Sequence, residues 1–218
     1  MAKKNLSSRA AFITIEGLEG SGKSSVISYL SSFLKKRGFR VKVFREPGST
    51  CVGEKIREIL LDKKNSRLSV HTELLLYLAA RTQLIEEKLF KALGLFDIVI
   101  CDRFFDSTLV YQGFGLGLGK IAESSVKMFS LGLDPDLTLV LDTEPLKGLR
   151  RLKKKDRIES RPLTFHSRLR KGYLALAEKF PKRIKVINAG GSLEDIFPQV
   201  SKQIDIFLSR YARKRINP

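Results

Sequence analysis

The octapeptide GLEGSGKS, residues 17 to 24, has the spacing of a loop that binds the phosphates of a nucleotide. It follows the apolar stretch AFITIE and precedes a stretch with helical periodicity, which is the strand–loop–helix context that such a loop requires. Its glycines allow backbone N–H groups to close around phosphate oxygens, and a helix N-terminus favours their negative charge. We therefore predict a phosphate-binding loop at Gly17, Leu18, Glu19, Gly20, Ser21, Gly22, Lys23, Ser24 and Ser25.

Three side chains of this loop have different predicted roles. Lys23 would neutralise the terminal phosphates of the nucleotide, and the Ser24 hydroxyl would bind Mg²⁺. Glu19 is unexpected, because a carboxylate within an anion-binding loop opposes the charge of the ligand. We predict that it contacts a second substrate beside the nucleotide. The loop alone does not separate GTPases, ATPases, helicases and small-molecule kinases, although the sequence lacks the N-K-x-D motif of Ras-type GTPases.

Three arginines could bind that second substrate. Arg45, in REPGST, and Arg103, in CDRFFDS, each follow a predicted strand, so we expect both at one edge of the sheet. A pair of guanidinium groups there suits the grip on a phosphate. Arg81 lies four residues after Tyr77 in a predicted helix and therefore on the same helical face. Together these two side chains could stack on a base and bond its edge.

The elements that position these residues alternate along the chain. Apolar runs predict buried strands over residues 11–16, 40–45, 97–102, 137–142 and 183–188. Helical patterns cover residues 23–36, 70–93 and 192–215, the last opening with a capping-box-like SLED, whereas GFGLGLG (113–119) is expected to be a mobile loop. This alternation predicts a three-layer α/β fold with a five-stranded parallel sheet between helices. The polar residues at the strand ends should then share one edge: Glu16, Gly17, Arg45, Glu46, Asp102, Arg103 and Asp142.

Composition sets broad limits on the protein. The 218 residues fit one domain, 1–218, without repeats or linkers, and the net charge of +18 favours phosphorylated partners. Cys51 and Cys101 are the only cysteines, and we expect free thiols rather than a disulfide. The basic start MAKKNLSSRA lacks the apolar run of a secretory signal, and no stretch is apolar enough to span a membrane. We therefore expect a cytoplasmic protein without a membrane partner.

Six segments, taken together, resemble the thymidylate kinase family. They are FITIEGLEGSGKSS, REPGST, LLLYLAAR, DRFFDSTLVYQG, PDLTLVLD and DRIE, in the family's order and spacing, within a similarity from about Phe12 to Ile206. The resemblance implies a nucleoside monophosphate kinase-like P-loop fold, transfer of the γ-phosphoryl of ATP to dTMP for dTTP synthesis, Mg²⁺ as cofactor and a homodimer. It is strongest to the bacterial form, in which Gly20 stands where other members carry an arginine.

The resemblance also implies roles for individual residues. Glu19 matches the carboxylate that meets the 3′-hydroxyl of the acceptor deoxyribose, and Arg45 and Arg103 match the arginines around its phosphate. Asp102 matches a carboxylate associated with Mg²⁺. The remaining matches are a ring that stacks on thymine (Tyr77), a contact to the base edge (Arg81), a polar base contact (Thr108), a tyrosine against C2′ (Tyr111) and acceptor-site neighbours (Pro47, Ser107). Two departures are Ser49, in place of a glycine, and the hydroxyl of Tyr77, where phenylalanine is usual.

The basic segment GLRRLKKKDRIESRP, residues 148–162, is predicted to be a mobile lid. Phosphoryl transfer spreads negative charge over equatorial oxygens, and a cation supplied by the chain stabilises that charge. Arg151 and Lys153 are the candidates, followed by Arg157, so that the predicted catalytic residues are Lys23, Asp102, Arg103, Arg151 and Lys153. His71 and His166 are assigned no role, and residues near Asn188 and Ala189 are expected to contact adenine.

Two other functions remain open at this point. A deoxynucleoside kinase would share the loop and could use Asp102 as a base toward a 5′-hydroxyl. Its neutral acceptor would, however, leave Arg45 and Arg103 without an anion. A nucleic-acid-binding protein that uses ATP as a switch would fit the net charge and the basic tail RYARKRINP. The sequence contains no known recognition module, so we expect no specific nucleic acid partner.

Overall fold

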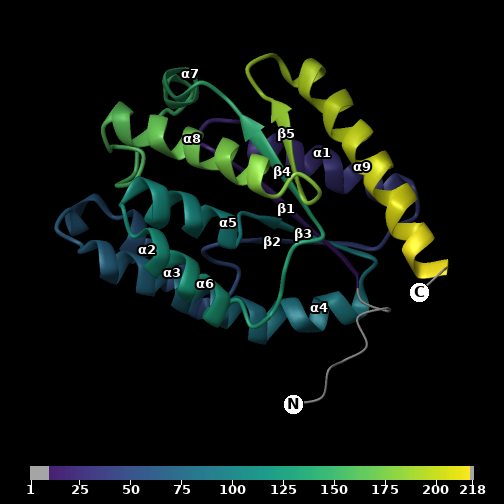
Figure 1. Ribbon diagram of the computed structural model, residues 1–218, viewed down its shortest axis with the longest axis horizontal. Coiled ribbons are helices and arrows are strands. Elements are labelled where there is room, and N and C mark those ends of the chain that lie inside the picture. The colour runs from purple at the N-terminus through teal and green to yellow at the C-terminus, as the bar shows by residue number, and fades with distance from the viewer. Residues whose placement is uncertain (1–9, 217–218) are drawn as a thin grey trace.

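Five parallel strands form the centre of the protein (Figure 1). The structure, a computed structural model, describes residues 10–216 and the side chains of residues 10–211. Residues 1–9 of MAKKNLSSRA and the last two residues of the tail RYARKRINP therefore lie outside the described residues. The strand order is β2-β3-β1-β4-β5. The predicted strands are confirmed within one residue at each end as β1 (Ala11–Gly17), β2 (Val41–Arg45), β3 (Ile98–Asp102), β4 (Leu137–Asp142) and β5 (Ile184–Asn188).

Helices cover both faces of this sheet, which confirms the predicted three layers (Figure 1). One face is covered by α1 (Lys23–Lys36) and α9 (Leu193–Ile216). The other is covered by α4 (Phe90–Leu95), α5 (Phe105–Thr108), α6 (Gly119–Phe129) and α8 (Leu163–Lys179). The remaining helices are α2 (Cys51–Leu61), α3 (Val70–Leu84), α7 (Pro145–Arg150) and a 3₁₀ turn (Lys63–Asn65).

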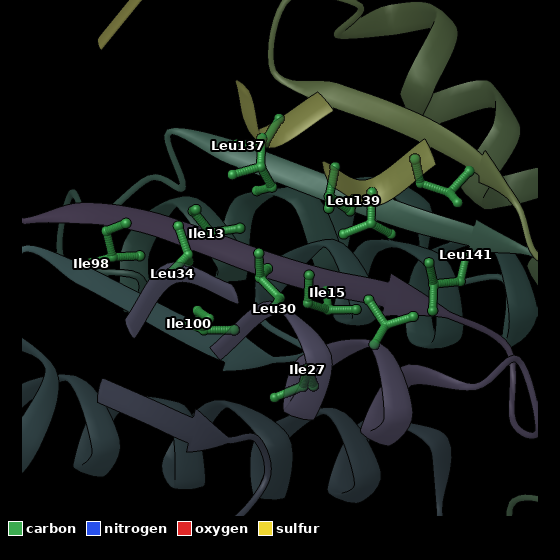
Figure 2. Close-up of a cluster of buried hydrophobic side chains, with 14 of the residues drawn as sticks. Ile13, Ile15, Ile27, Leu30, Leu34, Ile98, Ile100, Leu137, Leu139 and Leu141 are labelled. Atoms are coloured by element: carbon green, nitrogen blue, oxygen red, sulfur yellow. The ribbon is translucent and has the colours of Figure 1, made fainter. Parts of the chain in front are cut away.

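Alternation along each strand divides the core between the two faces. In β1, Ala11, Ile13 and Ile15 pack toward α1 and α9, within the cluster drawn in Figure 2. Phe12 packs on the opposite face, and by the same alternation Thr14 and Glu16 point there too. Glu16 is therefore directed toward α5 and α8 although apolar residues surround it in sequence. The sheet thus places one buried carboxylate on its α8 side.

Two expectations about helices need correction. The segment predicted as one helix over 70–93 contains a π-helical turn at Ile85–Leu89 between α3 and α4. The prediction of a mobile loop over 113–119 was wrong for residues 113–115, because Leu109–Gly115 is π-helical. Only three residues separate this π-helical segment from α6. A Cβ at Gly115 would lie 2.7 Å from side-chain atoms of Phe165 and Leu169. This glycine permits close packing against α8 rather than flexibility.

The second half of the segment 148–162 is tied to α3 by a buried ion-pair cluster. Glu73, which is fully buried, accepts from Arg157 at 2.7 Å and from Arg161 at 2.6 Å. Gln112 donates to the other oxygen of Glu73 at 3.0 Å, and Arg157 also donates to the Leu60 carbonyl at 2.6 Å. We call Glu73, Gln112, Arg157 and Arg161 the anchor cluster.

Among the described residues, no helix is long and apolar enough to cross a membrane.

We predict that Glu73→Gln lowers the free energy of unfolding by about 3–5 kcal/mol, because it leaves two arginines buried without their counter-ion. Urea denaturation followed by circular dichroism measures the change. The matched control is Glu123→Gln, whose carboxylate pairs with Lys179 at 3.6 Å but is 60% exposed, and it should leave stability unchanged. Equal stability of the Glu73 and Glu123 variants would show that the anchor cluster contributes nothing.

Candidate functional site

Polar residues from three strand ends meet at one cavity at the carboxyl edge of the sheet. Arg45 and Ile15 are both register partners of Asp102, so the segments that follow β1, β2 and β3 start at the same level. Thirteen of the residues predicted from the sequence line this cavity: Glu19, Gly20, Lys23, Ser24, Arg45, Pro47, Tyr77, Arg81, Asp102, Arg103, Ser107, Thr108 and Tyr111. The expectation that Arg45 and Arg103 share an edge with Lys23 is confirmed.

The phosphate-binding loop depends on glycine for its shape. Gly17, Gly20 and Gly22 all have positive φ, at 135°, 70° and 90°. A Cβ at Gly20 would lie 2.0 Å from the Gly148 carbonyl oxygen, so the loop and α7 touch backbone to backbone. An arginine could not stand at position 20 without moving α7. A cation for the transferred phosphoryl must therefore come from elsewhere in the chain.

Lys23 begins α1 and turns back over the loop. Its Nζ donates to the carbonyl oxygens of Leu18, at 2.8 Å, and Gly17, at 3.1 Å. Burial lowers the pKa of Lys23, and Arg103 lowers it further, to about 8, although nearby carboxylates oppose both effects. The lysine is thus charged at neutral pH but not far from losing its proton.

Glu19 is surrounded by donors. It accepts from Arg103 Nη2 at 2.9 Å and from the Tyr111 hydroxyl, and its second oxygen lies 3.6 Å from His166 Nδ1. Burial raises the pKa of Glu19, but His166, Arg103, Lys23 and Tyr111 together outweigh it and lower the pKa to about 2. The carboxylate stays ionised at any physiological pH, so its charge is compensated within the cavity itself.

The arginine after β2 is held by α2. Arg45 Nη2 donates to both carboxylate oxygens of Glu54, at 2.8 and 2.7 Å. Ser49, which replaces the usual glycine, adopts φ 65° and exchanges hydrogen bonds with the Arg45 backbone. Arg57 also lines the cavity and donates to the Pro47 carbonyl at 3.2 Å. Sequence reasoning missed Arg57, the fourth arginine of the cavity, because the motif REPGST carries no information about the helix that follows it.

The residues predicted for a base lie deeper in the cavity. Arg81 is 1% exposed, is paired with the buried Glu46 and donates to Thr108 Oγ1 at 2.8 Å. Its Nε and Nη1 are buried and have no hydrogen-bond partner among the described residues. Tyr77 lines the same part of the cavity, and burial raises the pKa of its hydroxyl. Donors left over beside an aromatic ring suit a flat, polar ligand.

Asp102 and Ser24 offer oxygen atoms near the loop. Asp102 Oδ1 is buried without a hydrogen-bond partner among the described residues, and Ser24 lines the same cavity with its hydroxyl. Mg²⁺ prefers oxygen ligands and commonly takes only one or two from the protein, the rest coming from phosphate and water. The two residues fit that pattern. Within residues 10–216 no group of three or more His, Cys, Asp or Glu side chains could hold a metal ion.

The predicted lid cations differ in their placement. Arg151, directly after α7, donates to the carbonyl oxygens of Gly20 at 3.0 Å and Gly191 at 3.4 Å, so it lies at the mouth of the loop. Lys153 is exposed and does not line the cavity. Arg157, the third candidate, points into the anchor cluster and is not brought together with the other predicted residues. The structure therefore places Arg151 nearest the loop.

The segment after β5, expected to contact adenine, lies beside α7. Lys147 donates to the Gly190 carbonyl, and Thr143 donates to the Ala189 carbonyl at 2.8 Å. Asn188 is exposed and accepts from the Gly190 backbone at 3.0 Å. This part of the chain thus lies next to the phosphate-binding loop, although it does not line the cavity described above.

Sequence reasoning missed the contribution of α8. His166, which we left without a role, is 1% exposed and lies beside Glu19. Tyr173 is seven residues further, on the same helical face, and donates to Glu16 at 2.8 Å. The seven-residue spacing was visible in the sequence, but no motif indicated which face of the helix would look toward the loop.

Comparisons with known proteins show the family of this chain. The family model of thymidylate kinase matches residues 15–200. The chain belongs to the thymidylate kinase family. A thymidylate kinase of Clostridium novyi is 40% identical over 88% of this chain and 97% of its own, and one of Caldanaerobacter subterraneus is 43% identical over 92% and 97%. The solved thymidylate kinase of Ehrlichia chaffeensis has a TM-score of 0.73 at 30% identity, covering 90% of this chain and 98% of its own.

Because the pKa of Lys23 is lowered to about 8, we predict that ATP binding to this member of the thymidylate kinase family weakens at high pH. Above pH 8 the free lysine loses its charge, so ATP affinity should fall by up to about tenfold per pH unit, and binding should take up a proton. Calorimetric titration at pH 8.5, in two buffers of different ionisation enthalpy, measures that proton. Lys36→Ala, at the exposed end of the same helix, should keep the uptake, and Lys23→Ala should abolish it. Identical uptake in both variants would contradict the assignment.

Proposed function

We propose that this cavity is where the chain transfers the γ-phosphoryl of ATP to dTMP, giving dTDP. The observation that carries the proposal is that cations from separate strands line one cavity with the phosphate-binding loop: Lys23 after β1, Arg45 at the end of β2 and Arg103 after β3. Two anionic nucleotides meeting head to head need such a set of cations. A single nucleotide held by the loop alone would not.

The donor phosphates lie along the loop. Backbone N–H groups of residues 17 to 24 close around the oxygens, and Lys23 neutralises the terminal phosphates. Ser24 and Asp102 would hold Mg²⁺, which would supply positive charge against the phosphate oxygens. Arg151 already contacts the loop at Gly20, and a small movement would bring its guanidinium to the transferred group. Lys153 is the second candidate for that cation.

The acceptor phosphate lies between Arg45 and Arg103. A phosphate monoester is already ionised near neutral pH, so its oxygen attacks without a strong general base. The chain then needs to hold donor and acceptor in line and to stabilise the spread charge. This agrees with a cavity that is rich in arginine and lacks a histidine among its lining residues.

The nucleoside of the acceptor fills the deeper end. Arg81 has two free buried donors for a base edge, with Tyr77 stacking on the ring and Thr108 beside it. Glu19 accepts the 3′-hydroxyl, and Tyr111, already bonded to Glu19, lies against C2′. A ribose 2′-hydroxyl would meet that ring, which favours deoxynucleotides.

A substrate panel tests the proposal. ADP production should depend on dTMP and be absent or slow with thymidine, because a neutral acceptor leaves the arginines unpaired. Lys23→Ala and Arg103→Ala should each lower kcat/KM by about 10²- to 10³-fold, in the range seen when one charge-stabilising donor is removed. Glu19→Ala should mainly raise the KM for dTMP.

The control for this panel is Arg168→Ala, an exposed arginine of α8, which should retain full turnover. Thymidine as the better acceptor would favour the deoxynucleoside kinase reading. ADP formation at the same rate with and without any acceptor, together with binding to DNA at physiological salt, would favour the nucleic-acid-binding protein that uses ATP as a switch.

We also propose that the protein acts as a homodimer through α2, α3 and α6, which pack side by side (Figure 1). These helices expose large apolar side chains, among them Ile59 at 44%, Leu75 at 61%, Ile121 at 50% and Met128 at 67%. Such a patch favours association with a like surface.

Sedimentation velocity should show a dimer that Leu75→Arg converts to a monomer, because the introduced charge would be buried in the interface. Leu95→Arg, an equally exposed leucine of α4, should leave the dimer intact. A monomeric wild-type protein at micromolar concentration would contradict the proposal.

A further inference from the structure

The guanidinium of Arg103 donates hydrogen bonds to four different groups of the protein. Its Nη1 donates to the Gly17 carbonyl at 2.9 Å, to the Tyr173 hydroxyl at 3.1 Å and to Ser107 Oγ at 3.2 Å. Its Nη2 donates to Glu19 at 2.9 Å. Its backbone has φ 69°, a left-handed conformation that only strong surrounding contacts maintain in an arginine. The position of this guanidinium is therefore over-determined.

The two hydroxyls that accept hydrogen bonds from Arg103, those of Tyr173 and Ser107, also bond to a buried carboxylate, that of Glu16. Glu16 Oε2 lies 2.6 Å from Ser107 Oγ and 2.8 Å from the Tyr173 hydroxyl, while Glu16 Oε1 accepts from the Phe104 backbone at 2.8 Å. Glu16 itself is fully buried and lies 4.0 Å from Arg103 Nη1. Two hydroxyls thus lie between a carboxylate and a guanidinium.

This arrangement fixes where the hydroxyl hydrogens point. An ionised carboxylate only accepts hydrogen bonds, and a guanidinium only donates them. Each hydroxyl has one hydrogen and two lone pairs, so both hydrogens must face Glu16 and the lone pairs must face Arg103. If Glu16 carries a proton, it can donate to one hydroxyl, whose own hydrogen then turns away from Glu16 and can reach the other hydroxyl, 3.0 Å away. The direction of the whole chain of bonds depends on the charge of Glu16.

We propose that Glu16 and Tyr173 are positioning residues for the acceptor phosphate: ionised Glu16 orients the Tyr173 and Ser107 hydroxyls, which hold Arg103 in its binding position. Neither Glu16 nor Tyr173 touches substrate. They act through Arg103, so this inference rests on the proposed role of that arginine. Because Tyr173 belongs to α8, which follows the segment 148–162 directly, the same contact links the acceptor site to the base of the predicted lid.

The charge of Glu16 is within reach of physiological pH. Burial raises its pKa to about 7, against the opposing effect of Arg103 and with a smaller contribution from Asp106 in the same direction. Below pH 7 the carboxyl is therefore mostly protonated, and above it mostly ionised. The other charged or titratable groups facing this site are Tyr173 on α8, Lys23 on α1, Cys101 in β3 and Arg183 before β5. Cys101 titrates well above this pH and Arg183 stays charged, whereas Lys23, with a pKa of about 8, is charged at pH 6 and partly deprotonated at pH 8.5.

The first test removes the hydroxyl. Tyr173→Phe keeps the ring in its apolar surroundings and should raise the Kd and the KM for dTMP about tenfold, the size expected for one hydrogen bond to a charged group. The KM for ATP should not change. The matched control is Tyr29→Phe, which loses a hydroxyl contact to Ser201 between α1 and α9. Unchanged dTMP binding by folded Tyr173→Phe would overturn the proposal.

The second test uses pH and does not depend on Tyr173→Phe folding. The Kd of Glu16→Gln for dTMP, divided by that of the wild type, should be about tenfold at pH 8.5 and should approach one at pH 6. Taking the ratio cancels the titration of the dTMP phosphate, which both proteins share. A ratio that stays constant with pH would overturn the proposal. Arg103→Ala separates the two claims, because normal dTMP binding by that variant would instead refute the proposed acceptor site.

Discussion

Charge compensation around Arg103 is the constraint on which the cavity depends. A cavity that binds two nucleotides must hold several cations close together, and like charges in a poorly solvated place repel strongly. The structure relieves this with two carboxylates beside Arg103: Glu19 pairs with it at 2.9 Å, and Glu16 lies 4.0 Å from it. Glu19 in the phosphate-binding loop is therefore less an obstacle to phosphate than a partner for the arginine after β3. The same carboxylate lines the cavity.

The sheet explains why these charges meet. Parallel strands of similar length bring residues 17, 45, 102 and 142 to one edge, as the register of Arg45 with Asp102 shows. Alternation then decides which face each residue serves. Ile15 packs into the core beneath α1, and Glu16, one residue later, turns toward α8. A shift of one residue in β1 would exchange these two side chains and remove the carboxylate behind Arg103.

Much of this could be read from the sequence, because the strands, α1 and the loop follow local rules. Apolar runs mark buried strands, and Lys23 to Lys36 begins and ends as predicted. The residues that the sequence did not reveal act over long separations. Tyr173 and Glu16 are 157 positions apart, and Arg161 and Glu73 are 88 apart. Only the packing of α8 against the sheet, and of the segment before α8 against α3, makes such pairs neighbours, and no local pattern encodes that packing.

The glycines of 113–119 give a second example of a feature that depends on packing between distant segments. Glycine in a short segment usually indicates a flexible turn, and that reading fails where a second helix approaches closely. At Gly115 the approaching side chains are Phe165 and Leu169 of α8. The helix that supplies Tyr173 to Arg103 can come this close to the site only because position 115 has no side chain.

The two ends of the segment 148–162 are held in different ways, and this limits which residues could act as a lid. Gly148 is pressed against the loop at Glu19 and Gly20, and Arg157 and Arg161 are buried with Glu73. The stretch between them, residues 151 to 156, is mostly exposed and carries one arginine and three lysines. A movement that left both ends in place would be confined to this stretch. If the segment acts as the proposed lid, the cations of this stretch are the ones free to move, because the close contact of α7 with Gly20 leaves no room for a side chain at position 20.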